Sequence, residues 1–344
     1  MSKNNDFGMP SPINGSSQNK KNKHPILWGL LIFLLLGIGS GGVYAYSVFT
    51  HTEKTVAKTY KDTNATKLRN VSSVLSQKKP FSILLMGTDT GALGRSDMGR
   101  TDTMIIATVN PSTKKTTLTS IPRDTQVKID GSGEDSSKIN SAYTYGGKDG
   151  ATLAVNTVQN LLDVPIDFYM LINMGGLEQI VDAVDGVDVK PLLTFDLEGT
   201  HYKKGQKIHL TGKQALAYTR MRHSDPMGDY GRQKRQKQII TAIAGKATSV
   251  NSLANYKQLL KTIDGNMITD LSFNDMITVE TNYGSASESI KSDLLQGTST
   301  AVEGLSYEVP TSDEKKRVSN AIRSELGLKE STQDFTSLEQ QLSK

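Results

Sequence analysis

The 344-residue chain contains no cysteine, which excludes disulfide bonds and thiolate chemistry. Its five histidines are scattered along the sequence, which argues against a histidine-rich zinc site. Neither a P-loop nor a Gly-x-Ser-x-Gly motif is present. A Gly-x-Gly-x-x-Gly match at 37–42 lies inside an apolar run with no strand before it, so it does not predict a dinucleotide site. Internal repeats are also lacking.

Positive charge is scarce outside the start of the chain. The formal net charge is +5, and residues 1–24 contribute most of it with four lysines against one aspartate. The rest of the chain is therefore nearly neutral, and bulk attraction to nucleic acid is not indicated. Any basic site there must be local.

One long apolar run is present, and it covers residues 26–49 without a single charged side chain. Such a run is long enough to span a bilayer. Because lysines precede it and no positive cluster follows closely, the positive-inside rule places the N-terminus in the cytoplasm. We expect a disordered cytoplasmic tail at 1–24, a signal-anchor helix at 25–49 and an extracytoplasmic remainder, so the cell membrane is the expected location. A cleaved signal peptide is the alternative, although the apolar core is long for one and no small-residue cleavage site directly follows.

The remainder divides into three parts by composition. Residues 50–79 are polar with sparse apolar positions and predict a stalk packing loosely on the body, which we expect over 80–310. The charged segment 311–344 predicts a peripheral tail. Strands are expected at 82–86, 104–109, 118–121, 166–172, 187–189 and 305–309. Helices are expected at 150–162, 176–184, 212–218, 230–248, 253–263 and 273–281. This mixture of strands and helices predicts an α/β or α+β domain of three layers.

Charged clusters lie at one end of each of the first three strands. They read Gly-Thr-Asp at 87–89, Gly-Arg-Thr-Asp at 99–102 and Ile-Pro-Arg-Asp at 121–124. If the strands form an antiparallel meander, all three clusters meet at one edge of the sheet. Two arginines and three aspartates would then converge, which suits a multiply charged anion bound together with a divalent metal.

Within these clusters, Asp89 and Asp102 match the one or two carboxylates that typically hold Mg²⁺ beside substrate phosphates. Ordinary turn chemistry is the alternative, since Asp beside Gly or Thr commonly ends a strand. Arg100 and Arg123 are the residue type that recognises phosphate with two parallel hydrogen bonds. Solvated surface arginines would fit the same pattern.

A second basic stretch runs from 220 to 236. Pro226 indicates that the preceding helix has ended, so Arg220 and Arg222 are expected on an extended segment, where they share a face. Asp229 is then placed to cap the next helix, whose N-terminus favours phosphate.

On that helix, Arg232, Arg235 and Gln236 fall on one stripe, which apolar residues continue. A solvated basic helix start would give the same pattern. Lys138 lies in a polar patch of a Gly-rich loop, from which it reaches an anion or is simply solvated.

Taken together, seven segments resemble the LytR–CpsA–Psr family. They occur in order between residues 81 and 240 and read ILLMGTDT, GRTDTMI, LTSIPRDT, KINSAYTYGG, VDGVDV, LTGKQALAYTRMR and GDYGRQKRQ. The resemblance implies a central mixed sheet between helices, with an apolar pocket for a polyprenyl tail. It further implies an extracytoplasmic phosphotransferase. Such an enzyme moves teichoic acid, capsular polysaccharide or a related anionic glycopolymer from an undecaprenyl-pyrophosphate carrier to peptidoglycan, as in Gram-positive cell walls.

Site residues follow from the same resemblance. Asp89 and Asp102 are implied as ligands of Mg²⁺, with Mn²⁺ as the alternative ion. The implied pyrophosphate clamp consists of Arg100, Arg123, Arg220 and Arg222. The implied flanking residues are Arg232, Arg235 and Gln236, to which the residue pattern adds Lys138 and Asp229. The family often has Gly where Asp185 stands in VDGVDV, a departure in a turn.

Expected partners are the lipid-linked glycopolymer, peptidoglycan and the membrane, without nucleic acid. Two other functions remain open. A membrane-tethered regulator of cell-envelope genes would need a DNA-binding element in residues 1–24, which are too few and too polar for a helix-turn-helix. A protein that binds or hydrolyses polyprenyl pyrophosphate without transfer would use the same site.

Overall fold

The computed structural model describes residues 59–89, 99–133, 136–222, 225–247, 265–302 and 304–335. The expected cytoplasmic tail, the expected membrane span at 25–49 and the expected helix at 253–263 lie outside these ranges. Within the described ranges, no helix combines the length and the apolar character that crossing a bilayer requires.

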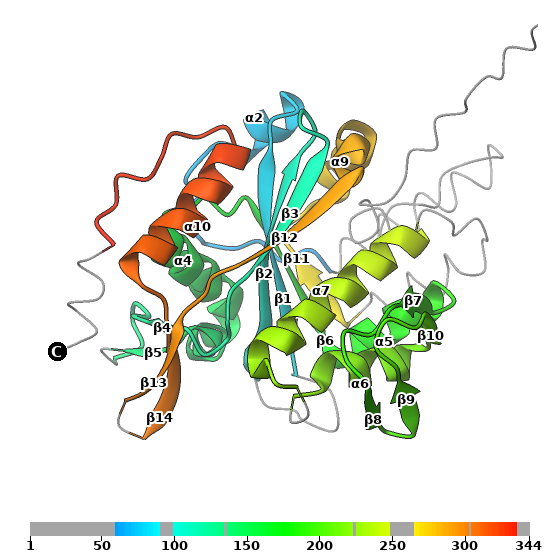
Figure 1. Ribbon diagram of the computed structural model, residues 1–344. Coiled ribbons are helices and arrows are strands. Elements are labelled where there is room, and N and C mark those ends of the chain that lie inside the picture. The colour runs from blue at the N-terminus through cyan, green and yellow to red at the C-terminus, as the bar shows by residue number, and fades with distance from the viewer. Residues whose placement is uncertain are drawn as a thin grey trace, which may run out of the picture.

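A six-stranded mixed sheet forms the centre of the molecule, with the strand order β11-β6-β1-β2-β3-β12 (Figure 1). Its strands are β1 (Phe81–Thr88), β2 (Thr101–Asn110), β3 (Lys115–Ser120), β6 (Phe168–Asn173), β11 (Met267–Thr269) and β12 (Ser289–Leu294). The predicted meander is confirmed, because β1 pairs antiparallel with β2 and β2 antiparallel with β3. Strands β6 and β12 pair parallel to β1 and β3, while β11 pairs antiparallel to β6.

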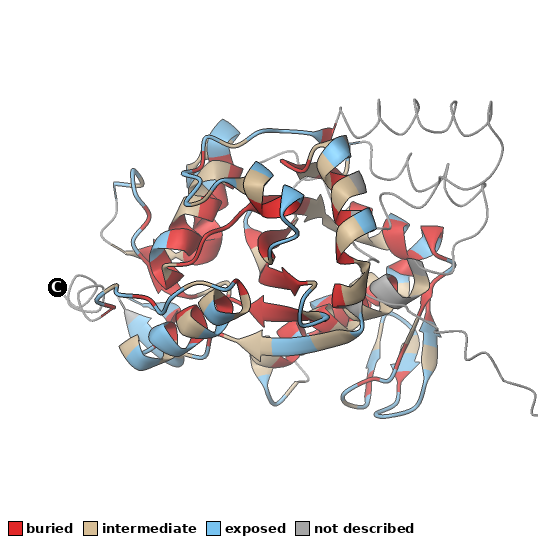
Figure 2. Ribbon diagram, turned by 90° about the horizontal axis from the view of Figure 1, so that it is seen from above, coloured by how far each residue is buried: buried red, intermediate tan, exposed pale blue. Residues whose placement is uncertain are grey.

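Helices cover both faces of this sheet. One face carries α2 (Val71–Ser76), α5 (Met174–Ala183), α6 (Gly212–Arg220), α7 (Gly228–Ala247) and α9 (Phe273–Tyr283). The opposite face carries α3 (Ala142–Tyr145), α4 (Gly150–Leu162) and α10 (Ser312–Glu325). Figure 2 shows buried strands between helices whose outer surfaces are exposed. The prediction of a three-layer domain with a central mixed sheet is confirmed.

The alternation of side chains along β1 explains why it lies between two cores. Ile83 and Leu85 join one apolar cluster, while Leu84 and Met86 join the other. Successive residues of a strand point to opposite faces, so a strand covered on both sides is an unbroken apolar run rather than an alternating one.

Local signals fixed several element ends. The capping box of Thr211 and Gln214 begins α6, as predicted. After α5, Asp185 (φ 60°) and Gly186 (φ 71°) adopt left-handed backbone conformations that end the helix. A Cβ on Gly186 would also lie 2.7 Å from the backbone carbonyl oxygen of Leu210, so the position favours glycine.

Short hairpins and turns complete the described fold. The paired strands are β4 (Gln126–Val127) with β5 (Ser137–Lys138), β7 (Val187–Val189) with β10 (Ile208–Leu210), β8 (Phe195–Leu197) with β9 (Thr200–Tyr202), and β13 (Thr298–Val302) with β14 (Leu305–Val309). The 3₁₀ turns are η2 (Ile139–Ser141), η3 (Gly147–Asp149) and η4 (Gly284–Ser287).

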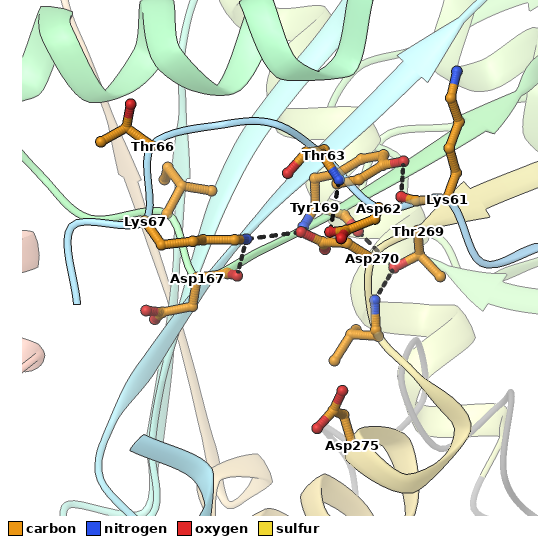
Figure 3. A network of polar contacts seen from close by, with 12 residues as sticks. Lys61, Asp62, Thr63, Thr66, Lys67, Asp167, Tyr169, Thr269, Asp270 and Asp275 are labelled. Atoms are coloured by element: carbon orange, nitrogen blue, oxygen red, sulfur yellow. Dashed lines mark hydrogen bonds and ion pairs between the residues drawn. The ribbon is translucent and has the colours of Figure 1, made fainter. Parts of the chain in front are cut away.

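Residues 59–79 differ from the loosely packed stalk that the sequence suggested. The Tyr169 hydroxyl donates to the Lys61 carbonyl at 2.7 Å, and Lys67 Nζ donates to Asp270 Oδ2 at 2.8 Å and to the Asp167 carbonyl at 2.7 Å (Figure 3). The Lys61 amide also donates to the Thr269 carbonyl at 2.8 Å. These contacts of Lys61 and Lys67 are polar or backbone-mediated, so the apolar pattern gave no sign of them, whereas Val74 and Leu75 of α2 pack into the apolar core.

The segment after Pro310 also differs from the expected peripheral tail. Val318 and Ile322 of α10 are 0% and 2% exposed, in the same core as α4. They are four residues apart and share one helix face, which the abundant charges on the other faces obscured. The folded body therefore includes α10.

Candidate functional site

A cavity of about 340 Å³ lies between the sheet and helices α5, α6 and α7. Figure 1 shows these three helices grouped on one side of the sheet. One part of its lining is charged or polar and includes Asp89, Asp102, Arg123, Arg220, Arg222, Arg232 and Gln236. The other part is apolar and includes Leu85, Met170, Ile172, Leu177, Ile180, Leu216, Ile239, Ile240 and Ile243. The cavity therefore suits a ligand with an anionic group and a long apolar part.

The β1–β2 pairing sets the acidic side of the cavity. Thr88 pairs with Thr101, and Asp89 and Asp102 are the residues that follow these two partners. The register shifts between Gly87 and Thr88, where a Cβ on Gly87 would lie only 3.0 Å from Thr103 Cβ. The structure thus brings the two aspartates to one edge.

Arg123 joins this edge at the exit of β3. Its NH1 donates to Asp102 Oδ2 at 2.8 Å, and its Nε lies 3.5 Å from Asp124 Oδ2. Burial alone would lower the pKa of Arg123, but the nearby Asp102 and Asp124 more than offset it and raise that pKa. Arg123 is therefore held as a cation beside the cavity.

Arg232 brings a second buried cation from the first turns of α7. It is 4% exposed, and its NH2 lies 2.7 Å from Asp229 Oδ1. Burial lowers the pKa of Arg232, and the charges of Arg123 and Arg222 act in the same direction. Its Nε has no hydrogen-bond partner among the residues that the structure describes. A buried guanidinium with an unsatisfied N–H group at a cavity wall is suited to an anion.

Arg220 and Arg222 line the same cavity with exposed side chains. Arg220 is the last residue of α6, and Arg222 follows the helix, so only the second lies on the predicted extended segment. Gln236 also lines the cavity, one helical turn after Arg232. Arg220, Arg222 and Gln236 therefore all lie at the cavity, in agreement with the anion site predicted from the sequence.

Arg235 does not line the cavity, in contrast to the prediction that it contacts substrate. It is 0% exposed, its Nε donates to the Tyr218 carbonyl at 3.0 Å, and it also bonds the Met221 carbonyl and the Asp225 carboxylate. Residues 232 and 236 are four apart and face the cavity, whereas residue 235 lies farther round the helix and faces α6. Arg235 therefore holds in place the end of α6 and the turn after it, which contain Arg220 and Arg222.

Three further predicted residues lie outside the cavity lining. Arg100 precedes Thr101, the first paired residue of β2, and its side chain is exposed. Lys138 Nζ pairs with Asp124 Oδ1 at 2.8 Å. Asp229 lies within the first turn of α7 rather than at its N-cap, and its Oδ2 accepts from Gln233 Nε2 at 2.9 Å. Lys138 and Asp229 thus hold neighbours of the site in place.

Other residues at the site were not singled out by the sequence. Asn140 is buried, and its Nδ2 donates to Asp102 Oδ1 at 3.3 Å. The polar patch around Lys138 was a signal for it, but nothing indicated which member of the patch would turn toward Asp102. Leu177 and Ile180 of α5 and Leu216 of α6 complete the apolar wall, and their helical spacing indicated only a core.

The two carboxylates at the cavity, Asp89 and Asp102, fit one type of metal site. Asp89 directly follows β1, Asp102 lies on the adjacent strand β2, and both line the cavity. No group of three or more His, Asp or Glu side chains that would hold a metal occurs in the described part of the chain. Mg²⁺ is commonly bound by one or two carboxylates, while substrate oxygens and water fill its remaining coordination positions.

Comparison with known proteins gives consistent matches. The LytR_cpsA_psr family model matches residues 44–324. The polyisoprenyl-teichoic acid–peptidoglycan teichoic acid transferase TagU of Enterococcus faecalis is 44% identical over 304 residues, which cover 88% of this chain and 97% of that protein. A solved structure described as a transcriptional regulator from Enterococcus faecalis has a TM-score of 0.66 at 38% identity, and the match covers 78% of this chain and 95% of that protein's chain. Another, described as TagT bound to LI-WTA, has a TM-score of 0.60 at 29% identity, with coverage of 73% and 92%.

Proposed function

Since this chain belongs to the LytR–CpsA–Psr family, we propose that it transfers an anionic glycopolymer from a polyprenyl-pyrophosphate carrier to peptidoglycan. A relative named as a teichoic acid transferase supports teichoic acid as the polymer. The observation that carries the proposal is a single cavity in which four arginines and two aspartates adjoin an apolar wall. A lipid-linked pyrophosphate has the matching anionic and apolar parts.

The charged part of the cavity would bind the pyrophosphate. Arg123 and Arg232 are buried or nearly so, and hydrogen bonds from guanidinium to phosphate are strong where water is excluded. Arg220 and Arg222, at the exposed rim, would contact oxygens nearer the solvent. The N-terminal end of α7, which carries Arg232, adds a favourable dipole for an anion.

The apolar part would hold the lipid. Ile239, Ile240 and Ile243 of α7 line the cavity together with Leu177 and Ile180 of α5, so each prenyl unit that enters is removed from water. Burial of apolar surface contributes roughly 25 cal/mol per Å². This wall therefore selects for a prenyl carrier over a free diphosphate.

In the proposed reaction, a sugar hydroxyl of peptidoglycan attacks the phosphorus that bears the glycopolymer. The bond from that phosphorus to the bridging oxygen breaks, polyprenyl phosphate leaves, and a phosphodiester joins polymer to peptidoglycan. The hydroxyl proton ends on the departing phosphate or in solvent, so the balance requires no cofactor. Arginine side chains that bind the developing charge on the leaving phosphate stabilise the transition state.

We further propose that Asp89 and Asp102 hold Mg²⁺, which when bound would neutralise charge on the pyrophosphate oxygens. Arg123 keeps Asp102 Oδ2 in place, and Asn140 does the same for Oδ1. We also propose that residues 25–49 anchor the protein in the cell membrane with the body outside, where the carrier lipid and peptidoglycan are both within reach.

The proposal is tested by incubating the full-length protein in detergent with Mg²⁺, a lipid-pyrophosphate-linked glycan and peptidoglycan oligomers. Mass spectrometry should detect a phosphodiester-linked product, and EDTA should abolish it. Release of free glycan phosphate without a linked product would indicate hydrolysis instead. Absence of both products, with unimpaired binding of the lipid, would favour a binding or regulatory protein.

A further inference from the structure

A partly buried tyrosine–glutamate pair joins α7 to the β13–β14 hairpin next to the charged end of the cavity. The hydroxyl of Tyr230, in the first turn of α7, donates to Glu308 Oε1 on β14 and accepts from the Gly297 amide at 3.0 Å. The other carboxylate oxygen of Glu308 accepts from Ser299 Oγ at 2.9 Å, and Glu308 is 9% exposed. Neither Tyr230 nor Glu308 lines the cavity.

The same strand also holds the segment that carries Arg123. The Glu308 amide donates to the Asp124 carbonyl at 2.9 Å, and Thr125 forms a parallel bridge with Glu308. Lys138, which pairs with Asp124, lies over the ring of Tyr307 at 5.8 Å. Glu308 thus contacts the Arg123 segment through its backbone and α7 through its side chain.

The third side of the arrangement is formed by Asp229, the residue before Tyr230. Its Oδ1 lies 2.7 Å from Arg232 NH2 and 3.8 Å from Arg123 Nε. The contacts therefore close a ring that passes through Arg123, Glu308, Tyr230 and Asp229. At the hairpin base the two strands approach Gly297 closely, since a Cβ on this residue would lie 2.8 Å from the Val309 carbonyl carbon.

A physical reason for such a ring lies in the two guanidinium groups. Arg123 and Arg232 repel each other, and the charge of Arg123 contributes to the lowered pKa of Arg232. Asp229 by itself is a weak bridge, since 3.8 Å to Arg123 is long for an ion pair. A second link that carries no net repulsion is needed to keep the two cations close before an anion arrives.

We propose that Tyr230 and Glu308 are positioning residues that fix the spacing of Arg123 and Arg232 and so shape the charged end for a pyrophosphate group. The choice of ligand rests on the proposed function, whereas the spacing rests on the contacts alone. Neither residue touches the substrate. Loss of the hydroxyl should let α7 and the Arg123 segment separate, so that both arginines no longer reach one diphosphate.

The test measures binding of inorganic pyrophosphate, with Mg²⁺, to the full-length protein by calorimetry. Tyr230→Phe removes only the hydroxyl and should weaken binding roughly tenfold, with a similar fall in kcat, because small misplacements are costly at such sites. Tyr283→Phe is the matched control, since the buried Tyr283 hydroxyl donates to the Lys79 carbonyl at 2.6 Å and lies outside the cavity lining. It should lower the Tm comparably and leave pyrophosphate affinity unchanged.

Glu308 supplies a second, independent test. Glu308→Gln keeps an oxygen that accepts from the tyrosine and should retain most of the affinity, whereas Glu308→Ala should lose about as much as Tyr230→Phe. In an Arg232→Ala background, Tyr230→Phe should have little further effect, which a general loss of stability would not produce.

Equal pyrophosphate affinities for Tyr230→Phe and Tyr283→Phe would overturn the positioning role, and so would equal losses for Glu308→Gln and Glu308→Ala. The two proposals fail separately. If the wild type transfers no glycopolymer while Tyr230→Phe still weakens pyrophosphate binding, the positioning role stands without the proposed function. If transfer occurs and Tyr230→Phe matches its control, only the positioning role is wrong.

Discussion

The guanidinium of Arg123 donates to Asp102 Oδ2 at 2.8 Å, so an arginine proposed for the substrate and a carboxylate proposed for the metal share one contact. The contact joins the exit of β3 to the start of β2, which the meander places side by side. Because each group fixes the other, a change in either should affect both anion binding and metal binding.

Arg123→Ala is expected to lower the transfer rate by about 10²–10³, because one strong electrostatic donor at a transition state contributes that much. Asp102→Ala should do the same, through loss of the proposed metal ligand. The mass-spectrometric transfer assay measures both. Arg317→Ala is the control, since Arg317 also pairs with carboxylates but lies outside the cavity lining. Near-normal transfer by both site variants would rule out this site.

Asn140→Ala is expected to lower transfer roughly tenfold, because Asp102 Oδ1 loses the amide that orients it. Asn160→Ala is a matched control, since Asn160 Nδ2 donates to Asp130 Oδ2 at 3.2 Å on an exposed part of the domain. The transfer rate of each variant is measured as a function of Mg²⁺ concentration, and only Asn140→Ala should need more Mg²⁺ than the wild type. Equal rates and equal Mg²⁺ dependence for the two variants would show that Asn140 has no role at the site.

Leu177→Trp is expected to fill the apolar part of the cavity and raise the KM for a long-chain polyprenyl donor about tenfold or more. Affinity for inorganic pyrophosphate should change little, because the charged end is untouched. Leu177→Met preserves the volume and serves as the control. If both variants use long and short prenyl donors as the wild type does, the lipid does not enter this cavity.

Arg235→Met is expected to destabilise the protein by about 3–5 kcal/mol, because it leaves the buried Asp225 carboxylate without its partner. Chemical denaturation gives the free energy of unfolding. Arg323→Met, at a more exposed pair with Asp163, should cost far less. A small loss of stability together with selective loss of substrate binding would instead make Arg235 a substrate contact.

Lys237 gives a prediction for pH. The residue is 7% exposed, and burial lowers its pKa to about 8 from 10.5. Between these two values the unfolded chain binds more protons than the folded one, so stability should rise with pH in that window, by up to about 3 kcal/mol. Lys237→Met should lack this rise when the free energy of unfolding is measured from pH 7 to 11. The exposed Lys234→Met should follow the wild type, and identical curves for all three would refute the prediction.

Much of the central fold could be predicted because its signals are local. Apolar runs with a charged cluster at one end gave β1, β2 and β3, and a two-residue signature gave the start of α6. The attachment of residues 59–69 could not be predicted, since it depends on Tyr169 and Asp270, far away in the sequence. Residue type alone does not tell which distant partner a polar side chain finds.

The contrast is sharpest on α7. The sequence by itself determined that Arg232, Arg235 and Gln236 lie on a helix, and that Asp89, Asp102 and Arg123 meet at one sheet edge if the strands form a meander. Only the tertiary structure decided that Arg232 faces the cavity while Arg235 is buried against α6. Helical spacing fixes the angles between side chains but not which neighbour packs on each side. That choice depends on contacts between elements that are far apart in the chain, and these also placed Tyr230 on Glu308.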